Sequence, residues 1–447
     1  MGAEVCELPP GWEPVPLGML LDDIVGGGTP SKSVPEYFQG SIPLMTVKDM
    51  KVSRPSQTGF NITEAALADS SAKVVPADTI IIATRMGLGK VVRPKMATAI
   101  NQDLKALFPK EALDKSFLEQ WLLSAASKIE AMGTGTTVKG IRLNQIRELE
   151  FVLPPINEQR RIVDKIETLF ADLDKGEETL RAVQKQLVRY RQSVLKAAVT
   201  GELTADWRAE NGAAEWRKIT LGELAEFLTS GSRGWAKYYS QRGDIFVRAQ
   251  NIKYDRLDLS DIAYVSLPQK SEGTRTRLKV GDLLITITGA NVTKSALVEK
   301  DIGTAYVSQH VALFRCTDQV DPEFLYWFVV ADYGGRKQLE DYAYGAGKPG
   351  LNLQNIKDVK LDLPPLPEQR EIVQRIKRLL TSQESLAAEL VRQERAANAL
   401  RQSILKDAFA GKLVPQDPAD EPASALLARI KASAPKAVKR SVRKAST

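Results

Sequence analysis

The chain has 447 residues, with two cysteines, one histidine, and 62 lysines and arginines against 55 aspartates and glutamates. This length predicts several domains. The composition excludes a disulfide framework and a histidine–cysteine metal site, and no apolar run is long enough to cross a membrane. Because we find neither a disulfide framework nor a signal-peptide pattern, we expect a cytoplasmic protein.

The net charge of +7 comes from the C-terminal end of the chain. No acidic residue follows Glu421, so residues 1–421 are neutral overall, and the net charge does not support nucleic-acid binding by the main body. The composition of the tail predicts disorder and a solubilising role, with non-specific phosphate contact as the alternative. The basic residues of this tail are Arg429, Lys431, Lys436, Lys439, Arg440, Arg443 and Lys444.

Residues 12–150 predict a mixed α/β domain. The run TIIIAT (79–84) is short and β-branched and follows Asp78, which predicts a buried strand. The spacing of apolar residues in SFLEQWLLSAASKIE (116–130) predicts a helix. The rest of the segment is rich in glycine, threonine and β-branched residues, which favours loops and strands.

A long helix is predicted after this domain. A Pro-Pro pair holds the chain extended just before Asn157, where the helix is expected to begin, and Gly201 suits its end. Between Ile162 and Val194 apolar residues recur at alternating steps of four and three, with Gly176 at one of these positions. That spacing is typical of a coiled-coil seam. The alternative is a wider bundle in which the polar seam positions face a gap or another chain.

The second half of the chain repeats the first. Residues 363–413 match residues 153–203 at a constant offset of 210, and Trp216 matches Trp12 at an offset of 204. We expect two copies of one scaffold related by a pseudo-two-fold axis, with antiparallel helices that hold the two domains a fixed distance apart. Two-fold symmetry suits a two-fold partner, of which duplex DNA with two half-sites is one case.

Motifs for catalysis are missing from the sequence. The string GGGTPSKS (26–33) has Ser31 where a phosphate-binding loop needs its second glycine, and MGLGKVV (86–92) has only the first two glycines of a dinucleotide loop. The lone His310 and two distant cysteines predict neither a metal site nor a Ser-His-Asp triad. The Asn/Asp-Pro-Pro-Tyr/Phe string of amino-methyltransferases is also absent. We therefore predict that the chain is not an enzyme by itself.

Two mixed α/β segments, each followed by an LPP-x-x-EQR helix, resemble the specificity subunit of a type I restriction–modification system. The resemblance covers about residues 10–415, and the tail extends beyond it. In IIATRMGLGK (81–90) Arg85 and Met86 replace the more usual glycine-rich turn. The strings that carry the resemblance are LPPINEQRRIV (153–163), LPPLPEQREIV (363–373), VLKAAVTGEL (194–203), ILKDAFAGKL (404–413), TPSKSVPEYFQGSIPLMTVKDM (29–50) and GDLLITITGANVTKSALV (281–298).

The resemblance implies a mixed α/β (α+β) fold with internal pseudo-two-fold symmetry. Two target recognition domains would be joined by two long antiparallel helices that form a coiled coil. The expected segments are residues 1–152 as target recognition domain 1, 153–211 as helical spacer 1, 212–362 as target recognition domain 2, 363–415 as helical spacer 2, and 416–447 as a basic, disordered tail.

The resemblance also implies a function in phage defence. Each domain would recognise one half of a bipartite, asymmetric DNA site, while the helices set the gap and dock two modification (methyltransferase) subunits, which two restriction (translocase/nuclease) subunits then join. The chain would bind no cofactor, and S-adenosylmethionine, ATP and Mg²⁺ would belong to the partner subunits. Two alternatives stay open. One is a coiled-coil scaffold that docks proteins without reading DNA, and the other is a stand-alone specificity protein.

Sequence-specific DNA recognition needs side chains at base edges, where arginine and lysine suit guanine, and asparagine and glutamine suit adenine. We therefore expect DNA contacts from polar residues in turns beside the predicted strands. The candidates in the first domain are Ser31, Lys32, Lys48, Arg85, Lys90 and Lys139. The candidates in the second domain are Ser232, Arg233, Arg248, Gln250, Asn251, Asn291, Lys294 and Lys348.

Other polar and aromatic residues have different expected roles. Lys139 and Lys348 lie in loops before the helices and suit phosphate contacts better than base contacts. His310 is expected to be a hydrogen-bonded residue of the domain. Core packing, rather than stacking on a base, is expected of Trp235, Tyr238 and Tyr239.

Overall fold

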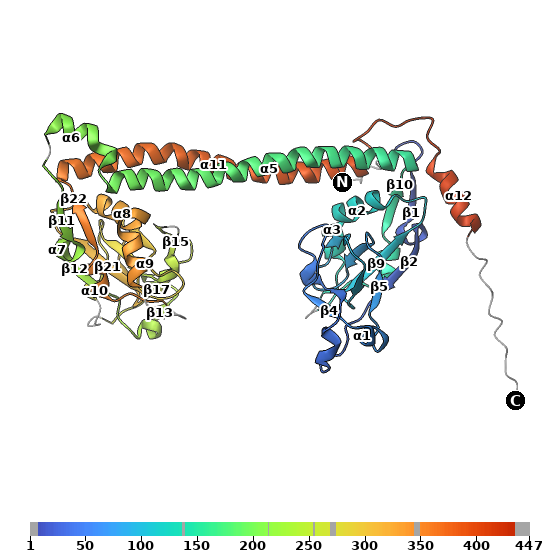
Figure 1. The fold of residues 1–447 in the computed structure, drawn as a ribbon, viewed down its shortest axis with the longest axis horizontal. Coiled ribbons are helices and arrows are strands. Elements are labelled where there is room, and N and C mark those ends of the chain that lie inside the picture. Colours follow the sequence, from blue (N-terminus) through green and yellow to red (C-terminus); the bar gives the residue numbers. More distant parts are fainter. Residues whose placement is uncertain are drawn as a thin grey trace. The chain divides into compact units, whose positions relative to one another are not determined.

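The chain divides into two compact units, each with one α/β domain (Figure 1). One unit comprises residues 1–178 and 393–447, and the other comprises residues 179–392. Two long helices, α5 (Ile156–Val199) and α11 (Leu366–Phe409), each contribute to both units. A computed structural model describes residues 8–135, 139–212, 214–253, 255–268, 274–343 and 349–433.

The first α/β domain contains two four-stranded sheets. One sheet has the order β2 (Leu21–Gly26), β9 (Leu104–Pro109), β6 (Ile80–Ala83) and β7 (Val91–Val92), with antiparallel neighbours. The other has the order β4 (Phe60–Ile62), β3 (Ile42–Met45), β8 (Thr98–Ile100) and β5 (Lys73–Val75), in which β3 and β8 are parallel. Its helices are α1 (Glu64–Ala68), α2 (Lys115–Ser124), α3 (Ala126–Ala131) and α4 (Leu143–Arg147).

The second α/β domain repeats the main sheet of the first. Its order is β12 (Ala225–Ser230), β21 (Val311–Cys316), β18 (Leu283–Thr286) and β19 (Ser295–Leu297). The other sheet has the order β13 (Tyr239–Ser240), β17 (Ala263–Val265), β14 (Asp244–Val247) and β20 (Ala305–Val307), and a hairpin joins β15 (Ile252–Lys253) to β16 (Arg256–Leu257). Its helices are α6 (Ala205–Asn211), α7 (Leu221–Leu224), α8 (Pro322–Val330), α9 (Lys337–Tyr342) and α10 (Leu353–Lys357).

A two-stranded sheet closes each domain just before its long helix. In the first domain β1 (Glu13–Pro16) pairs with β10 (Glu150–Leu153), and in the second β11 (Arg217–Thr220) pairs with β22 (Lys360–Leu363). The start and end of each domain are therefore joined by backbone hydrogen bonds. The internal repeat and the mixed α/β fold predicted from the sequence are confirmed.

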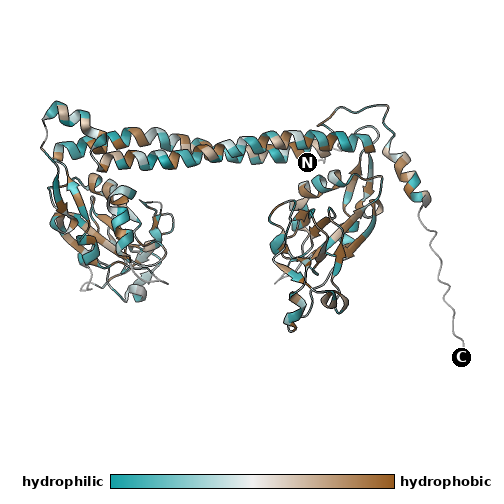
Figure 2. Ribbon diagram, in the orientation of Figure 1, coloured by the Kyte–Doolittle hydropathy of each residue, from teal (hydrophilic) through white to brown (hydrophobic). Residues whose placement is uncertain are grey.

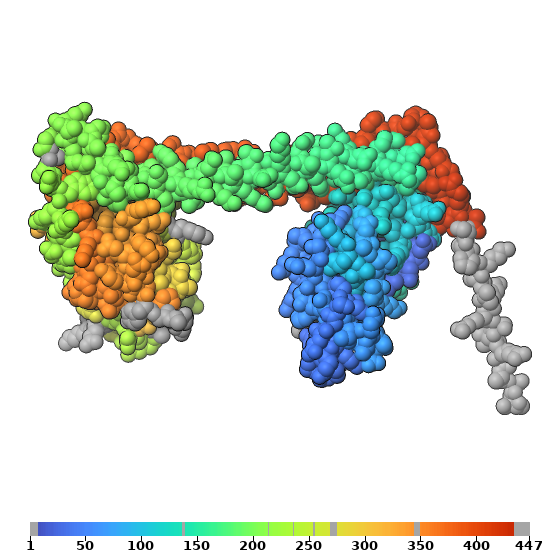
Figure 3. Space-filling model, viewed as in Figure 1, coloured from blue at the N-terminus to red at the C-terminus, as the bar shows by residue number. Residues whose placement is uncertain are grey.

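The core of each domain continues into the ends of the long helices. In the first unit Phe117 of α2 packs in one cluster with Ile162 of α5 and Leu405 of α11. In the second unit Phe324 of α8 packs with Ile372 of α11 in the same way. Figure 3 shows that the atoms of α2 and α5 pack in contact in the first unit. The ends of the long helices are therefore part of each domain's core. Burying one such side chain contributes about 1.5–3 kcal/mol to stability.

The two long helices, each 44 residues long, run antiparallel. In the first unit Arg401, near the end of α11, forms ion pairs with Asp174 and Glu177 in the first half of α5. In the second unit Gln383, in the first half of α11, donates to the carbonyl of Leu187 in the second half of α5. Apolar and polar residues alternate along both helices (Figure 2). The predicted coiled-coil pairing is confirmed.

The seam differs in its middle from the expected pattern. The alternating spacing placed Gly176 and Tyr190 in the seam, but both are exposed, and Glu177 and Arg191 are half-buried instead. A helix with 3.6 residues per turn drifts against a strict seven-residue repeat, so single positions leave the buried face while Leu180 and Leu187 keep theirs. Several apolar side chains of the two helices are also exposed. The exposed apolar residues of the two helices are Val188, Tyr190, Leu386, Val391 and Leu400.

The glutamate and glutamine of the LPP-x-x-EQR strings are structural. Gln159 is fully buried, and its amide donates to the carbonyls of Ala112 and Pro154 at 3.0 and 2.9 Å and accepts from the Asp114 N–H at 2.8 Å. Gln369 makes the corresponding three bonds in the second unit. These bonds tie the start of each long helix to the loop before α2 or α8. The motif therefore holds each domain on its helix.

The tail begins later than expected. Residues 416–433 were expected to be disordered, but they include α12 (Ala423–Ser433), which packs on the first domain. Asp420 forms an ion pair with Arg161 at 2.7 Å, and the Ala423 N–H donates to the carbonyl of Gly11 at 3.0 Å. Ala423, Leu426 and Leu427 form one buried face of this helix. The disorder prediction missed it because it rested on the average composition of the tail. Residues 434–447, with most of the basic cluster, lie outside the described residues.

None of the described helices combines the length and the apolar character that a membrane span requires.

Candidate nucleic-acid interface

The turns that follow the strands of the first domain meet at one edge of its sheets. Because β2 and β6 are both antiparallel to β9, their last residues lie opposite its start, and Ala83 pairs with Leu104. In the second sheet Met45 of β3 pairs with Ile100, the residue with which β8 ends just before β9 begins. The polar turns after these strands therefore gather in one place. We call residues 27–33, 46–48, 84–90 and 101–105 the first turn edge.

Three of the predicted basic residues come together on the first turn edge, and a fourth, Lys139, lies beside it. Arg85 forms a backbone bridge with Gly140, which places Lys139 beside it. The turn that carries Arg85 and Lys90 also lies against the residue before Lys48. All four basic side chains are exposed, and that of Arg85 is 51% exposed. These cations are able to face the phosphates or base edges of one duplex.

Ser31 and Lys32 lie on the loop that leaves the same edge. Both are exposed, and Ser31 exchanges a hydrogen bond with Ser33 at 2.7 Å. The loop is anchored by Thr29, whose hydroxyl donates to Gln102 at 2.6 Å. The structure thus places all six candidates of the first domain on this edge or beside it.

Lys105 is a further cation of the first turn edge that sequence reasoning missed. Its ammonium donates to the carbonyls of Gln102 and Leu104 at 3.3 and 3.2 Å. Burial lowers the pKa of Lys105, and the charge of Arg85 lowers it as well, whereas Asp103 raises it. Lys105 lies between apolar residues in the sequence, so only its pairing opposite the end of β2 reveals its place.

The second domain has an equivalent edge. Ser230 at the end of β12 pairs with Ala312, and Thr286 at the end of β18 pairs with Val311, so both strands end beside the start of β21. The parallel strands β14 and β20 end together at Val247 and Val307. We call residues 231–235, 248–251, 287–294 and 308–310 the second turn edge.

A pocket with aromatic and polar lining residues lies on the second turn edge. Arg248 and Gln250 both donate to the same carboxylate oxygen of Asp261, at 3.1 and 2.9 Å, which holds the two side chains next to each other. Arg233 and Lys294 are exposed on the neighbouring turns. The residues that line the pocket are Ser232, Gly234, Trp235, Tyr239, Phe246, Arg248, Ala249, Gln250, Ser308, Gln309 and His310.

Asn251 has a different role from the one predicted. It is 2% exposed, and its amide donates to the carbonyls of Asp258 and Asp261 at 3.0 and 2.8 Å. Its oxygen accepts from the Arg248 N–H at 3.0 Å. A side chain committed in this way holds the loop and does not reach a base edge. Asn291, which is half-buried, donates to the carbonyl of Ala249 at 3.3 Å and joins two turns, and Lys348 lies outside the described residues.

The histidine and aromatic residues mostly take the expected places. His310 bonds the Thr288 hydroxyl through Nδ1 and the Gln309 amide through Nε2. Trp235 is 5% exposed and stacks on Phe246 with ring centroids 5.5 Å apart. Tyr239 is instead about half exposed at the pocket. His310 is also exposed there, which makes it a pocket residue that the candidate set omitted.

The described residues offer neither a metal-binding cluster nor a reactive thiol. No group of three or more histidine, cysteine, aspartate and glutamate side chains within the described ranges could hold a metal ion. Burial raises the pKa of the Cys316 thiol to about 11, so this cysteine is a poor nucleophile at neutral pH. Burial likewise raises the pKa of Tyr326 to about 12.

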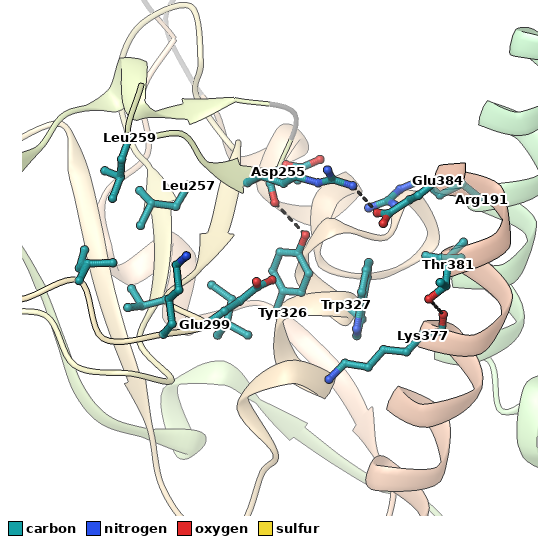
Figure 4. Close-up of a pocket in the computed structure, with 16 residues that line it drawn as sticks. Arg191, Asp255, Leu257, Leu259, Glu299, Tyr326, Trp327, Lys377, Thr381 and Glu384 are labelled. Carbon is teal, nitrogen blue, oxygen red and sulfur yellow. Dashed lines mark hydrogen bonds and ion pairs between the residues drawn. The ribbon is translucent and has the colours of Figure 1, made fainter. Parts of the chain in front are cut away.

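A second pocket lies where the β15–β16 hairpin meets the helices of the second unit (Figure 4). Arg256 of the hairpin forms an ion pair with Glu384 of α11, and the Tyr326 hydroxyl donates to the Asp255 carbonyl at 2.7 Å. Arg191 of α5 lies over the ring of Trp327, 5.3 Å from its centroid. These contacts connect the second domain to α5 and α11, and the pocket lies where they meet.

One family model matches most of the chain. This model, described as "Type I restriction modification DNA specificity domain", matches residues 9–182 and 213–391. Each match covers one copy of the internal repeat except for the last part of its long helix.

Relatives of known function are similar over nearly the whole chain. The StySPI specificity subunit of Salmonella potsdam, a type I restriction enzyme, is 26% identical over 95% of this chain and 96% of its own length. The EcoKI specificity subunit of Escherichia coli K12 has the same identity and the same coverage. A shorter segment, 37% of the chain, is 36% identical to the EcoR124I/EcoR124II specificity subunit of Escherichia coli.

Solved structures share the fold. A chain from a study of assembly and conformational transition in the type I R-M system superposes with a TM-score of 0.70 at 21% identity, over 91% of this chain and 99% of that one. The HsdS subunit from Thermoanaerobacter tengcongensis superposes with a TM-score of 0.52 at 21% identity, over 92% of this chain and 100% of its own.

Proposed function

The chain belongs to the family of type I restriction–modification specificity subunits, and from this premise we propose that each α/β domain recognises one half of a bipartite, asymmetric DNA site. The observation that carries this proposal is the pair of turn edges. In each turn edge, polar and basic turns from separate parts of the domain lie together because the strands that precede them are paired in rigid sheets. That arrangement suits direct contact with base edges and phosphates.

The asymmetry of the site follows from residue differences on a shared scaffold. A short helical turn in the first domain lies between the capping residues Thr46 and Asp49, and the corresponding turn in the second lies between Arg248 and Asn251, whose side-chain oxygen accepts from the Arg248 N–H. Between the caps Lys48 and Gln250 occupy the same position. Lysine suits guanine or phosphate, whereas glutamine suits adenine, so the two edges are expected to select different bases.

The long helices are proposed to set the gap between half-sites and to dock modification subunits. Five apolar side chains remain exposed on them, and such surfaces suit burial against another protein. We propose two modification (methyltransferase) and two restriction (translocase/nuclease) subunits as partners in the cytoplasm. S-adenosylmethionine, ATP and Mg²⁺ would be bound by those partners. The alternative, a docking scaffold without DNA recognition, leaves the two turn edges without a role.

Domain exchange tests the proposed function. Replacing residues 12–150 with the equivalent segment of a relative is expected to change one half of the methylated sequence and to leave the other half unchanged. Long-read mapping of methylated bases in cells with the parent or the chimaeric chain measures both halves and the gap. If the motif is lost on gene deletion but is unaffected by exchange of either domain, the scaffold alternative is favoured.

Lengthening the helices tests their proposed role as a spacer. Four residues inserted into each of α5 and α11 add about 6 Å of helix, so the tolerated gap is expected to grow by one or two base pairs. Both half-sequences should stay the same in methylation maps. The control is an insertion of equal length in the loop at residues 415–419, outside both helices. An unchanged gap in the helix variant contradicts the spacer role.

A further inference from the structure

Met86 presents an unexplained apolar side chain on the first turn edge. It is 66% exposed, in a turn that also carries the exposed cations Arg85 and Lys90. Its backbone φ is +52°, in the left-handed region that methionine rarely adopts. Exposure of a large apolar group and backbone strain coincide at one residue. Such strain persists where the surroundings impose it, and it is concentrated at functional sites.

The turn around Met86 is held on several sides. The Thr84 N–H donates to the carbonyl of Asp103 at 2.8 Å, and the Ile141 N–H donates to the carbonyl of Thr84 at 3.0 Å. A Cβ added at Gly89 would lie 2.8 Å from the carbonyl oxygen of Ala126. These contacts leave the turn little freedom, so the methionine is displayed in a preorganised position.

The second domain lacks this feature. The backbone bridge between Arg85 and Gly140 has its counterpart in the bridge between Thr288 and Gly350, so the position of Met86 is occupied by Gly289. Gly289 has the same left-handed backbone, with a φ of +91°, but no side chain to present. The apolar group is therefore specific to the first turn edge, as expected of a residue that selects a sequence.

We propose that Met86 contacts the 5-methyl group of a thymine in the half-site read by the first domain. This inference rests on the proposed function. The thymine methyl is the apolar group on a base edge in the major groove, so it is the natural partner of an apolar side chain presented to a duplex. The neighbouring cations Arg85, Lys90 and Lys139 would hold the backbone phosphates or adjacent bases around it.

Thymine-to-uracil substitution tests the contact because uracil differs from thymine only by the methyl group. The full chain in complex with its modification subunits is titrated at constant salt with duplexes in which each thymine of the first half-site is replaced in turn. One replacement is expected to weaken binding by about fourfold, the value of one buried methyl group. Met86→Ala should show the same loss on thymine DNA and no further loss on that uracil duplex.

Two further variants separate recognition from folding. Met86→Gly should raise the melting temperature of the complex, because glycine tolerates the left-handed backbone, and should still lose about fourfold in affinity. Val280→Ala is the matched control. Val280 is 59% exposed in a turn before β18, at the opposite end of that strand from the second turn edge, and this variant should bind like the parent chain.

The outcomes distinguish this inference from the proposed function. The assignment of Met86 is overturned if no thymine-to-uracil replacement weakens binding. It is also overturned if the replacement weakens binding of the Met86→Ala chain as much as that of the parent chain. In both cases selective binding stands. If the parent complex does not prefer its methylated motif to a scrambled duplex, the proposed function fails, and the inference fails with it.

Discussion

Replacing Glu368 with glutamine is expected to lower the free energy of unfolding of the second unit by about 3 kcal/mol. Glu368 is fully buried and forms an ion pair with Arg208. Its carboxylate also accepts from the Thr204 hydroxyl at 2.7 Å and from Trp216 Nε1 at 2.9 Å. The amide keeps the shape of the side chain but removes its charge. The partly buried guanidinium of Arg208 would then lose this counter-charge.

The same substitution at the equivalent Glu158 is expected to have the opposite effect at neutral pH, a gain in the free energy of unfolding. Glu158 accepts from Trp12 Nε1 at 2.9 Å, but its other oxygen has no hydrogen-bond partner. Burial raises the pKa of Glu158, and the Trp12 bond and the charge of Arg161 offset this only in part. Asp420, which is paired with Arg161, raises the pKa of Glu158 further.

The sign of the Glu158 effect depends on pH. Since its pKa is higher in the folded than in the unfolded chain, ionised Glu158 costs stability as the pH rises through the unfolded value and up to the folded one. The gain from Glu158→Gln should therefore be full at neutral pH and should disappear below about pH 4. A gain that persists unchanged at low pH would contradict the buried-carboxylate explanation.

Urea unfolding of the full chain at two pH values measures both effects. Hydrogen exchange of peptides from each α/β domain assigns a change to one unit, because a chain with several domains need not unfold in one step. We expect Glu368→Gln to increase exchange around Trp216 and Glu158→Gln to decrease it around Trp12. Equal destabilisation at both sites would show that the two copies of the motif are energetically alike.

Gly27→Ala is expected to cost the first unit about 3 kcal/mol or more. A Cβ at this position would lie 1.7 Å from the carbonyl oxygen of Ile100, so the loop after β2 has to move away from β8. That movement also endangers the hydrogen bond from the Gly28 N–H to the Ile100 carbonyl, which measures 3.1 Å. Because the first turn edge includes this loop, DNA selection by the first domain should weaken too.

The control for Gly27→Ala is the same substitution at Gly176. That glycine is exposed in the middle of α5, and no heavy atom lies within 4 Å of an added Cβ. Gly176→Ala should raise stability by about 0.5–1 kcal/mol, since alanine favours a helix more than glycine does. Urea unfolding of both variants checks the prediction. A Gly27→Ala chain as stable as the parent would mean that the close approach is not maintained in solution.

Local patterns in the sequence predicted most of the architecture. The predictions of the two long helices and of the buried strand TIIIAT depend on apolar patterns within short segments. The repeat at a constant offset predicted two copies of one domain, and the sheet orders agree with it. In α5 the seam prediction was wrong only at Gly176 and Tyr190, because a strict seven-residue pattern does not show where the helical period of 3.6 moves a single position out of the buried face.

The two turn edges could be identified only from the strand pairing in the structure. Polar residues in turns were predictable, but turns separated by dozens of residues meet only because β2, β6 and β9 pair side by side. Lys105 was missed for this reason. Asn251 was chosen by residue type alone, whereas its bonds to two carbonyls show a structural role. The prediction that the remaining candidates contact DNA stays a prediction.

The sequence by itself determined the duplication, the two mixed α/β segments, the paired helices and the family, because each depends on periodicity, offset or a contiguous motif. Only the tertiary structure decided the buried role of the motif glutamates and glutamines, the packing of α12, and the strained exposure of Met86. These features arise from contacts between residues distant in the chain, such as Trp12 with Glu158. Burial, hydrogen bonding and close approach act through space, and a linear pattern does not encode them.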